Sequence, residues 1–354
     1  MVIKSTGYNI YTSNAFTRLR AWLDKKSYSE IFILCDENTM AGCLAILLAN
    51  VPALAEAEVI ETESGEKNKA LEVCAGIWQT MIEQNTSREA LLVNLGGGVI
   101  CDMGGFCGAV YKRGIDFIHV PTTLLAMVDA SVGGKTAVDL GASKNMIGCF
   151  AHPRAVFVEK TFLHSLSARH YYNGLAEVFK IALVADAGLL SYLDKHGGTA
   201  DMQKLINSCI KLKNNIVAKD PSDKALRKIL NFGHTIGHAV ESMALQHNID
   251  LLHGEAVIAG IIMESHISLQ KKMLSEQDLI AIVSLLMGHY SKLSFEPLPG
   301  ELEQFLRNDK KNKGTQNLFS LITRPGNCKW DIPVNMKEIK KALEFYNSLQ
   351  YAEN

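Results

Sequence analysis

The first half of the chain alternates short apolar runs with longer segments that suit helices. Five runs rich in β-branched or other apolar residues stand out: IFILC (31–35), AEVIE (57–61), LLVNL (91–95), FIHVP (117–121) and AVFV (155–158). Runs of this length predict strands, and the longer segments between them predict helices. Strands that alternate with helices form a mostly parallel sheet. We therefore expect an α/β, Rossmann-like N-terminal domain.

The pattern changes from about residue 170 onward. β-branched runs become rare, and in the stretches 201–219 and 275–293 apolar residues recur every three or four positions. This period predicts amphipathic helices. With 354 residues, the chain is also longer than one hydrophobic core usually supports. We predict two domains, an α/β domain over residues 1–168 and an all-α domain over residues 169–354.

Composition excludes several classes of partner. The chain has 36 Lys and Arg against 37 Asp and Glu, a net charge of -1, so there is no broad electrostatic attraction to nucleic acid or to an anionic membrane. The most apolar stretch, near 251–263, contains His253 and Glu255 and is no membrane span. The 8 cysteines form no C-x-x-C pair, and the N-terminus shows no signal pattern. We expect a cytoplasmic protein with reduced thiols.

Polar and glycine residues follow three of the predicted strands. Because the carboxyl ends of parallel strands meet at one edge of a sheet, Asp36, Gly96–Gly98 and Thr122–Thr123 are expected at a ligand edge. The glycine-rich turn GGGVICDMGG allows backbone amides to approach a pyrophosphate at a helix N-terminus. It departs from the Rossmann fingerprint at Cys101, so a tight turn without a ligand is the alternative. Asp36 could bond a ribose hydroxyl and repel NADP, or be an ordinary loop residue.

The segment 121–145 concentrates polar chemistry. It reads PTTLLAMVDASVGGKTAVDLGASKN, and its hydroxyl, carboxylate, amide and ammonium groups favour a phosphorylated, hydroxyl-rich ligand. It is not an ATP-binding Walker A loop, because Asp129 stands where that motif needs a glycine before Gly134. A solvated loop with Lys135 and Lys144 as surface charges is the alternative, and the apolar neighbourhood speaks against it.

Three histidines and a glutamate have the character of a metal site. NFGHTIGHAVE places His234 and His238 on one helical face, HGEA supplies His253, and GLAEVFK supplies Glu177 with Lys180 one turn later. Two histidines and a carboxylate fit a catalytic divalent metal such as zinc, whereas histidines buried in a core are the alternative. Spacing leaves the choice of histidines open and by itself favours His234 with His238, although the H-E-x-x-H motif of metalloproteases is absent.

Taken together, these segments resemble the 3-dehydroquinate synthase family of sugar phosphate cyclases. The resemblance runs from about Asp36 to Lys311 through GGGVICDMGGFCGAVYKRG, HVPTTLLAMVDASVGGKTAVDLGASKNMIGCF, GLAEVFK, NFGHTIGHAVE and HGEAV, in order. It implies a Rossmann-like N-terminal domain, a helical C-terminal domain, bound NAD, one Zn²⁺ or Co²⁺ and a homodimer. The implied partner is a small phosphorylated sugar acid.

The resemblance also implies a role for each matching residue. The metal ligands would be Glu177, His234 and His253, so that His238 would face the substrate. The positions around NAD would be Asp36, Asn38, Glu66, Lys69, Gly98, Val99, Asp102, Thr122, Thr123, Lys135, Lys144, Phe162 and Ser165. The substrate's hydroxyls and carboxylate would meet Asp129, Lys180, Lys213, Arg227, Asn231 and Lys310 or Lys311. Its phosphate would meet Lys135, Asn145 and, from across the dimer, Arg113.

The reaction implied by the family converts 7-phospho-2-dehydro-3-deoxy-arabino-heptonate to 3-dehydroquinate and phosphate in the shikimate pathway. NAD oxidises a secondary alcohol, the ketone acidifies the neighbouring C–H, and phosphate leaves; the hydride then returns, the ring opens and an aldol step closes the carbocycle. Lysine and histidine side chains would serve as proton relays or electrostatic partners. The substrate's own phosphate can take the proton, so no single general base is assigned.

Some residues depart from the family pattern. Met127 stands where relatives have a Gln, the run Ser167–His170 stands in place of a Pro-x-Arg-Glu run, and Asp220–Pro221 stands in place of an acidic pair. We expect these changes to affect NAD affinity and turnover more than the type of reaction.

Three rival functions are open. They are a cyclase making amino-dehydroquinate or 2-deoxy-scyllo-inosose, a glycerol-dehydrogenase-like oxidoreductase, and a non-catalytic relative that binds NAD and metal. The dehydroquinate reaction is favoured because a carboxylate suits Lys213, Arg227, Asn231 and His238.

Overall fold

A computed structural model describes residues 1–141, 143–293, 295–307 and 317–349, in two compact units. The first unit comprises Met1–Tyr171 with Met202–Asn214, and the second comprises Tyr172–Asp201 with Asn215–Asn354. Helix α8 (Met202–Lys219) therefore lies mostly with the first unit, although the sequence places it in the second domain. Side-chain hydrogen bonds explain this, since Gln203 donates to the Thr12 carbonyl at 2.7 Å and Asn214 to the Lys4 carbonyl at 2.9 Å.

A seven-stranded sheet forms the centre of the first unit. Its order is β1-β2-β9-β6-β5-β3-β4, and every neighbouring pair is parallel except β1 with β2. All five predicted strands are present, so the predicted parallel sheet is confirmed. The strands are β1 (Val2–Lys4), β2 (Asn9–Tyr11), β3 (Ile31–Asp36), β4 (Glu58–Thr62), β5 (Leu91–Gly96), β6 (Asp116–Pro121) and β9 (Ala155–Phe157). The chain order reverses between β3 and β5, which is where ligands bind in such sheets.

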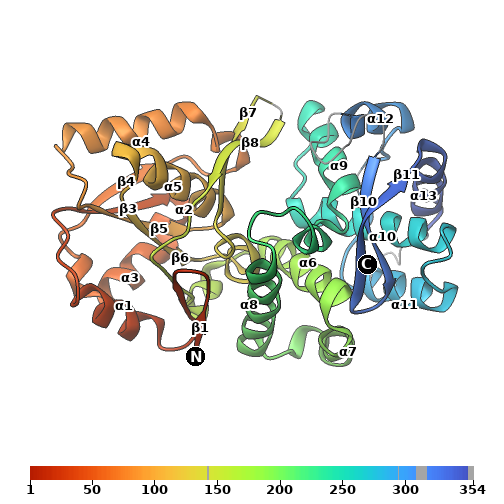
Figure 1. Ribbon diagram of the computed structural model, residues 1–354, viewed down its shortest axis with the longest axis horizontal. Helices are drawn as coiled ribbons and strands as arrows, with labels where there is room; N and C mark the ends of the chain where they lie inside the picture. The colour runs from red at the N-terminus through yellow and green to blue at the C-terminus, as the bar shows by residue number, and fades with distance from the viewer. Residues whose placement is uncertain (142, 294, 308–316, 350–354) are drawn as a thin grey trace. The chain divides into compact units, whose positions relative to one another are not determined.

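Helices cover both faces of this sheet (Figure 1). Helices α4 (Leu71–Glu83) and α5 (Gly98–Val110) lie on one face, and α1 (Ala15–Leu23) and α3 (Ala45–Asn50) lie on the other. The central strands are buried from both sides, which is why they read as unbroken apolar runs. The short elements of the unit are α2 (Glu37–Thr39), η1 (Met40–Leu44), η2 (Pro52–Leu54), η3 (Glu66–Asn68), η4 (Tyr111–Arg113), η5 (Ala126–Ala130) and η6 (Lys160–Ser165).

The polar segment that follows β6 folds back on itself. After η5 it forms an antiparallel hairpin of β7 (Lys135–Leu140) and β8 (Ser143–Phe150), which the sequence analysis does not predict. Thr136 and Val138 alternate with more exposed neighbours, so the hairpin turns one face inward, toward α5. The hairpin thereby brings Lys144 and Asn145 next to Glu66 and Lys69.

The second unit is mainly helical, as predicted. Helix α10 packs against α9, α11, α13 and β10 and is buried along most of its length. The unit also contains an antiparallel hairpin of β10 (Asn317–Arg324) and β11 (Asn327–Val334) that the all-α prediction lacks. Its helices are α6 (Ala168–Ala185), α7 (Ala187–His196), η7 (Gly197–Thr199), η8 (Leu226–Asn231), α9 (His234–Gln246), α10 (His253–Gln270), α11 (Glu276–Met287), α12 (Pro299–Arg307) and α13 (Met336–Ser348). Among the described residues, no helix is long and apolar enough to cross a membrane.

The contact between α5 and the sheet leaves no room at Gly104. A Cβ atom there would lie 2.0 Å from Asn94 Oδ1 and 2.8 Å from Leu34 Cδ2, and both side chains are buried. We expect Gly104→Ala to destabilise the protein by about 1–3 kcal/mol through overpacking. The matched change Gly76→Ala, in α4 where nothing lies within 4 Å, should stabilise it by up to about 1 kcal/mol. Thermal unfolding of both variants tests this, and an equal effect of the two changes would contradict it.

Candidate metal centre and cofactor site

Three side chains of the second unit converge to form the candidate metal centre. Glu177 lies on α6, and His234 and His253 are the first residues of α9 and α10. The Nε2 atoms of both histidines lie 3.3 Å from Oε1 of Glu177, and all three ligand atoms lie within 4.8 Å of one another. Ligands of a tetrahedral zinc ion at 2.0–2.1 Å are about 3.3 Å apart. The spacing therefore fits a divalent ion.

The outer nitrogens of both imidazoles are held by oxygen atoms. His234 Nδ1 lies 3.1 Å from the Phe232 carbonyl oxygen, and His253 Nδ1 lies 3.2 Å from Glu241 Oε2. When each Nδ1–H donates to its oxygen, the Nε2 atom of a neutral imidazole has its lone pair available to a metal ion. This arrangement is typical of metal-binding histidines, and it shows that these residues are suited to hold a metal ion.

His238 belongs to a second, overlapping group. His238, Glu241 and His253 also have ligand atoms within 4.8 Å of one another. In that group the Nδ1 atom of His253 is the one that faces Glu241. The hydrogen bonding thus favours Glu177, His234 and His253 as the donor set, and it argues against the pair His234 and His238 that spacing alone favours.

Electrostatics make the centre suitable for a cation. Glu177 is 2% exposed and pairs with Lys180, whereas His253 is 26% exposed and accessible. Burial by itself raises the pKa of Glu177, but Lys180 and His234 outweigh it, so that the pKa lies well below its ordinary value. Burial lowers the pKa of His234. Burial also acts to lower the pKa of His253, yet Glu241 and Glu177 raise it to about 10. Glu177 is therefore ionised, and an ion that binds His253 Nε2 would displace the proton that the raised pKa keeps on that imidazole.

Local hydrogen bonds bring the three helices together. The Gly254 N–H at the start of α10 donates to Asn173 Oδ1 on α6 at 2.5 Å. Asn173 precedes Glu177 by about one helical turn, so the bond sets α10 beside the ligand on α6. Sequence reasoning missed both Asn173 and Glu241. Glu241 lies one turn after His238 in NFGHTIGHAVE, a spacing that could have drawn attention to it.

In the first unit, five predicted residues form a polar cluster at the sheet edge. Lys69 is 3% exposed, and its Nζ lies 2.7 Å from Asp102 Oδ2 and 2.6 Å from Asn145 Oδ1. Glu66 Oε1 lies 3.9 Å from Lys69 Nζ and 3.2 Å from Lys144 Nζ. Burial acts to lower the pKa of Lys69, but the carboxylates of Asp102 and Glu66 raise it. A buried, charged lysine thus connects η3, α5 and the β7–β8 hairpin.

Asp139 is a further member of this cluster that sequence reasoning missed. Its Oδ1 accepts the Asn145 N–H at 2.6 Å, and its own N–H donates to the Lys69 carbonyl at 2.8 Å. Asn145 has a left-handed backbone with φ 52°, which asparagine tolerates better than most residues. Asp139 thereby fixes the turn that presents Asn145 to Lys69.

Other predicted cofactor residues follow the ends of adjacent parallel strands. Asp36 ends β3, and its Oδ1 accepts the Thr39 N–H at 2.8 Å as the cap of α2, which contains Asn38. Gly98 and Val99 begin α5 after β5, and Thr122 and Thr123 follow β6. The structure therefore places these residues along one edge, as predicted for a ligand site.

The remaining predicted residues of the first unit are more dispersed. Phe162 is fully buried and packs edge-to-face on Phe16, and Ser165 Oγ donates to the Phe162 carbonyl at 2.9 Å. Asp129 and Lys213 pair at 2.7 Å. Arg113 follows the far end of α5, a 13-residue helix about 20 Å long, and thus lies remote from Gly98. Within this unit, Arg113 is not brought to the ligand edge.

In the second unit, Arg227 and Asn231 lie on η8, which precedes the candidate metal ligand His234 in the chain. Arg227 is 2% exposed, and its Nη1 donates to the Pro221 carbonyl at 3.0 Å. Asp220 accepts backbone N–H groups from Lys224, Ala225 and Arg227 at 2.7–3.0 Å. Asp220 and Pro221, which differ from the family pattern, therefore form a turn that positions Arg227. Lys310 and Lys311 lie outside the described residues.

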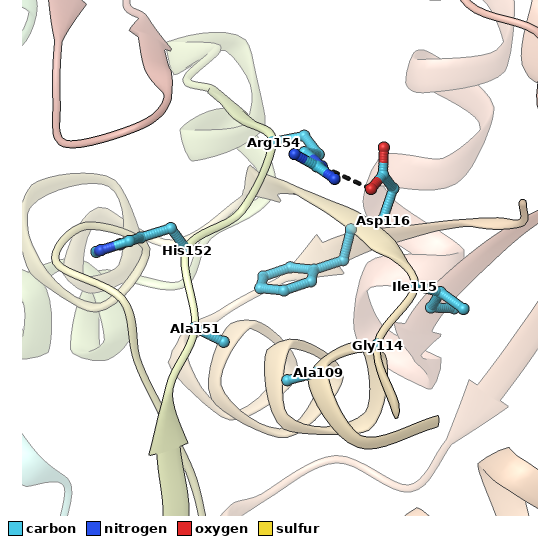
Figure 2. A pocket seen from close by; sticks show the side chains of 8 residues that line it. Ala109, Gly114, Ile115, Asp116, Ala151, His152 and Arg154 are labelled. Carbon is cyan, nitrogen blue, oxygen red and sulfur yellow. Dashed lines mark hydrogen bonds and ion pairs between the residues drawn. The ribbon is translucent and has the colours of Figure 1, made fainter. Parts of the chain in front are cut away.

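Two cavities of the first unit lie away from these residues. They have volumes of about 300 and 330 Å³, and both border Asp116 at the start of β6. Figure 2 shows the first of them, where Arg154 pairs with Asp116 at 2.5 Å beside Ile115 and Ala109. This is the amino edge of the parallel sheet, opposite the edge at which ligands bind. We therefore exclude them from the candidate site.

The fold is that of the sugar phosphate cyclases. The solved structure of 2-deoxy-scyllo-inosose synthase with carbaglucose-6-phosphate, NAD⁺ and Co²⁺ has a TM-score of 0.87 at 23% identity, over 97% of this chain and 99% of its own. That of 2-epi-5-epi-valiolone synthase from Streptomyces hygroscopicus, with NAD⁺ and Zn²⁺, has a TM-score of 0.84 at 26% identity, over 98% of each chain.

Sequence comparison narrows this class to one family. The family model for the 3-dehydroquinate synthase N-terminal domain matches residues 59–173, and the family model for the C-terminal domain matches residues 174–312. The 3-dehydroquinate synthase of Parabacteroides distasonis is 36% identical over 335 residues, 93% of this chain and 95% of its own. The chain belongs to the 3-dehydroquinate synthase family.

Glu241 provides a test of the metal centre. We expect Glu241→Gln to lower the affinity for Zn²⁺ by about 10–100-fold, because an uncharged amide holds His253 Nδ1 less firmly. The matched control is Glu301→Gln, whose carboxylate lies 3.0 Å from His247 Nε2 at the surface. Competition titration with a chelator measures both variants. Equal affinities of the two variants and the unmodified protein would contradict the role of Glu241.

Proposed function

We propose that this chain is a 3-dehydroquinate synthase, a lyase that converts 7-phospho-2-dehydro-3-deoxy-arabino-heptonate to 3-dehydroquinate and phosphate. The reaction belongs to the shikimate pathway of aromatic amino acid biosynthesis. The observation that carries the proposal is the donor set of Glu177, His234 and His253, with both Nδ1 atoms anchored, in a chain of this family. Relatives that make other carbocycles are less similar in sequence, which makes them the weaker alternative.

Two groups from outside the chain complete the chemistry. A Zn²⁺ or Co²⁺ ion held by Glu177, His234 and His253 would polarise the substrate oxygen as a Lewis acid. NAD held near Asp36, Gly98, Lys69 and Asp102 would accept a hydride and return it. Two imidazole nitrogens and one carboxylate oxygen suit either metal, and the partly exposed His253 leaves the centre open to a ligand.

The chain's own residues bind and orient the substrate. In the second unit, Lys180 keeps Glu177 ionised and supplies a positive charge, and His238 can hold or move a proton. Asp220 and the Pro221 carbonyl pre-orient Arg227 for a carboxylate, with Asn231 on the same short helix. In the first unit, Lys135 and Asn145 are assigned to phosphate, and Asp129 with Lys213 to substrate oxygens. Pre-orientation of this kind lowers the entropic part of the barrier.

We extend the proposal to a cytoplasmic homodimer. Arg113 lies remote from the residues at the carboxyl edge of its own sheet, which supports a role for it toward a partner copy. All eight cysteines are free, and most are buried, which suits a reducing compartment.

Phosphate release tests the proposed reaction. We expect the metal-loaded protein with NAD to release phosphate from 7-phospho-2-dehydro-3-deoxy-arabino-heptonate and to form a carbocycle. Glu177→Ala should lower the rate by more than about 100-fold, because the buried Lys180 then lacks its counter-charge and the ion lacks a ligand. Turnover of glucose 6-phosphate instead would indicate a sibling cyclase. Binding of NAD and metal without any release would indicate a non-catalytic relative.

Two histidine variants test the choice of ligands. We expect His234→Ala to lower Zn²⁺ affinity by more than about 100-fold, since a ligand is lost. His238→Ala, its neighbour one turn along α9, should keep the ion and lose turnover. Metal content after dialysis against a weak chelator distinguishes the two. Loss of metal from His238→Ala but not from His234→Ala would indicate that the metal is held by His238, Glu241 and His253 instead.

A further inference from the structure

The first turn of α9 carries the candidate metal ligand His234, and its first backbone N–H groups need hydrogen-bond acceptors that the helix backbone does not supply. His234 is the first residue of α9, and its first three residues are all buried. The first N–H groups of any helix lack partners within the helix, and burial keeps water from supplying them. A side chain at the N-cap position usually accepts one of them.

Here the N-cap residue cannot supply such a side chain. It is Gly233, with φ 79°, and a Cβ atom on it would lie 2.4 Å from Ile261 Cγ1 and 3.1 Å from the Val257 carbonyl oxygen. The contact is equally close from the other side, since a Cβ on Gly260 would lie 2.0 Å from the Gly233 carbonyl oxygen. Helices α9 and α10 therefore touch through their backbones at this point. The first turn of α9 also contains no acidic residue.

A carboxylate on α10 takes the place of the missing cap. Glu264 is fully buried, its Oε2 accepts the Gly233 N–H at 2.7 Å, and its Oε1 accepts the Ile236 N–H at 3.0 Å. Gly233 is the N-cap residue and Ile236 the third residue of the helix, so these are the two N–H groups that a capping box satisfies. A negative charge is also favourable at this end of a helix.

We propose that Glu264 is a positioning residue for the metal ligand His234, an inference that rests on the proposed metal centre. The two N–H groups that Glu264 binds lie on either side of His234 in the chain. They hold the first turn of α9 in the register in which His234 Nδ1 meets the Phe232 carbonyl and Nε2 meets Glu177. Helix α10 also begins with His253. It therefore supplies one candidate ligand from its first residue and positions the other, His234, through Glu264.

The test compares two buried changes in α10. Glu264→Gln keeps the shape but loses the charge and sets an amide NH₂ against one of the two N–H groups. Ser268→Ala removes a buried hydrogen bond within the same helix, from Ser268 Oγ to the Glu264 carbonyl at 3.0 Å. We expect Glu264→Gln to lower Zn²⁺ affinity by about 10–100-fold and to shift the visible absorption bands of the Co²⁺-loaded protein. Ser268→Ala should leave both unchanged, whatever it does to thermal stability.

The outcomes separate this inference from the metal centre itself. A folded Glu264→Gln protein with unchanged Zn²⁺ affinity and an unchanged Co²⁺ spectrum would show that Glu264 contributes stability alone, and would overturn the inference. Failure of the unmodified protein to bind Zn²⁺, or retention of Zn²⁺ by Glu177→Ala, would overturn the metal centre first and this inference with it.

Hydrogen exchange of the unmodified protein covers the case in which Glu264→Gln does not fold. The amides of Gly233 and Ile236 should be strongly protected without metal, and their protection should increase when Zn²⁺ binds. Fast exchange of these two amides, or protection that does not respond to Zn²⁺, would contradict the role of Glu264.

Discussion

An ionised carboxylate that is almost out of contact with water is the constraint on which the second unit depends. Burying such a charge costs several kcal/mol unless opposite charges and hydrogen bonds surround it. Glu177 meets this condition through Lys180 on its own helix and through the histidines that begin α9 and α10. Three helices must therefore keep fixed separations for the carboxylate to be tolerated. The same convergence creates the donor set for a divalent ion.

The groups behind the ligands are as important as the ligands. The Phe232 carbonyl and Glu241 orient the two imidazoles, Asn173 joins α6 to the start of α10, and Glu264 caps α9. Each of these bonds satisfies a buried polar group that would otherwise destabilise the fold. Stability of the unit and geometry of the site thus rest on the same contacts, and these contacts orient the candidate ligands without an ion.

The first unit repeats this logic with the opposite sign of charge. Lys69 is a buried cation, and Asp102, Asn145 and Glu66 surround it with oxygen atoms. These partners come from η3, α5 and the β7–β8 hairpin, so the lysine joins three segments at the carboxyl edge of the sheet. The parallel arrangement of β3, β5 and β6 brings the ends of those strands to the same edge. A polar ligand such as a dinucleotide would meet donors and acceptors that are already fixed there.

The sequence by itself determined the five predicted strands, most of the helices and the kinds of chemistry, because these are local properties. Apolar runs such as 31–35 and 91–95 are strands since a strand buried on both faces has to be apolar throughout, and the motifs around Glu177, His234 and His253 are short enough to recognise. The spacing of the histidines could not show which of them share a carboxylate, and the tertiary structure alone decided where α8 belongs, that two hairpins form, and that Asp139, Glu241 and Glu264 support the site. These features depend on distances between residues such as Gly233 and Glu264 that are far apart in the chain, and the period of a helix or a strand carries no information about such distances.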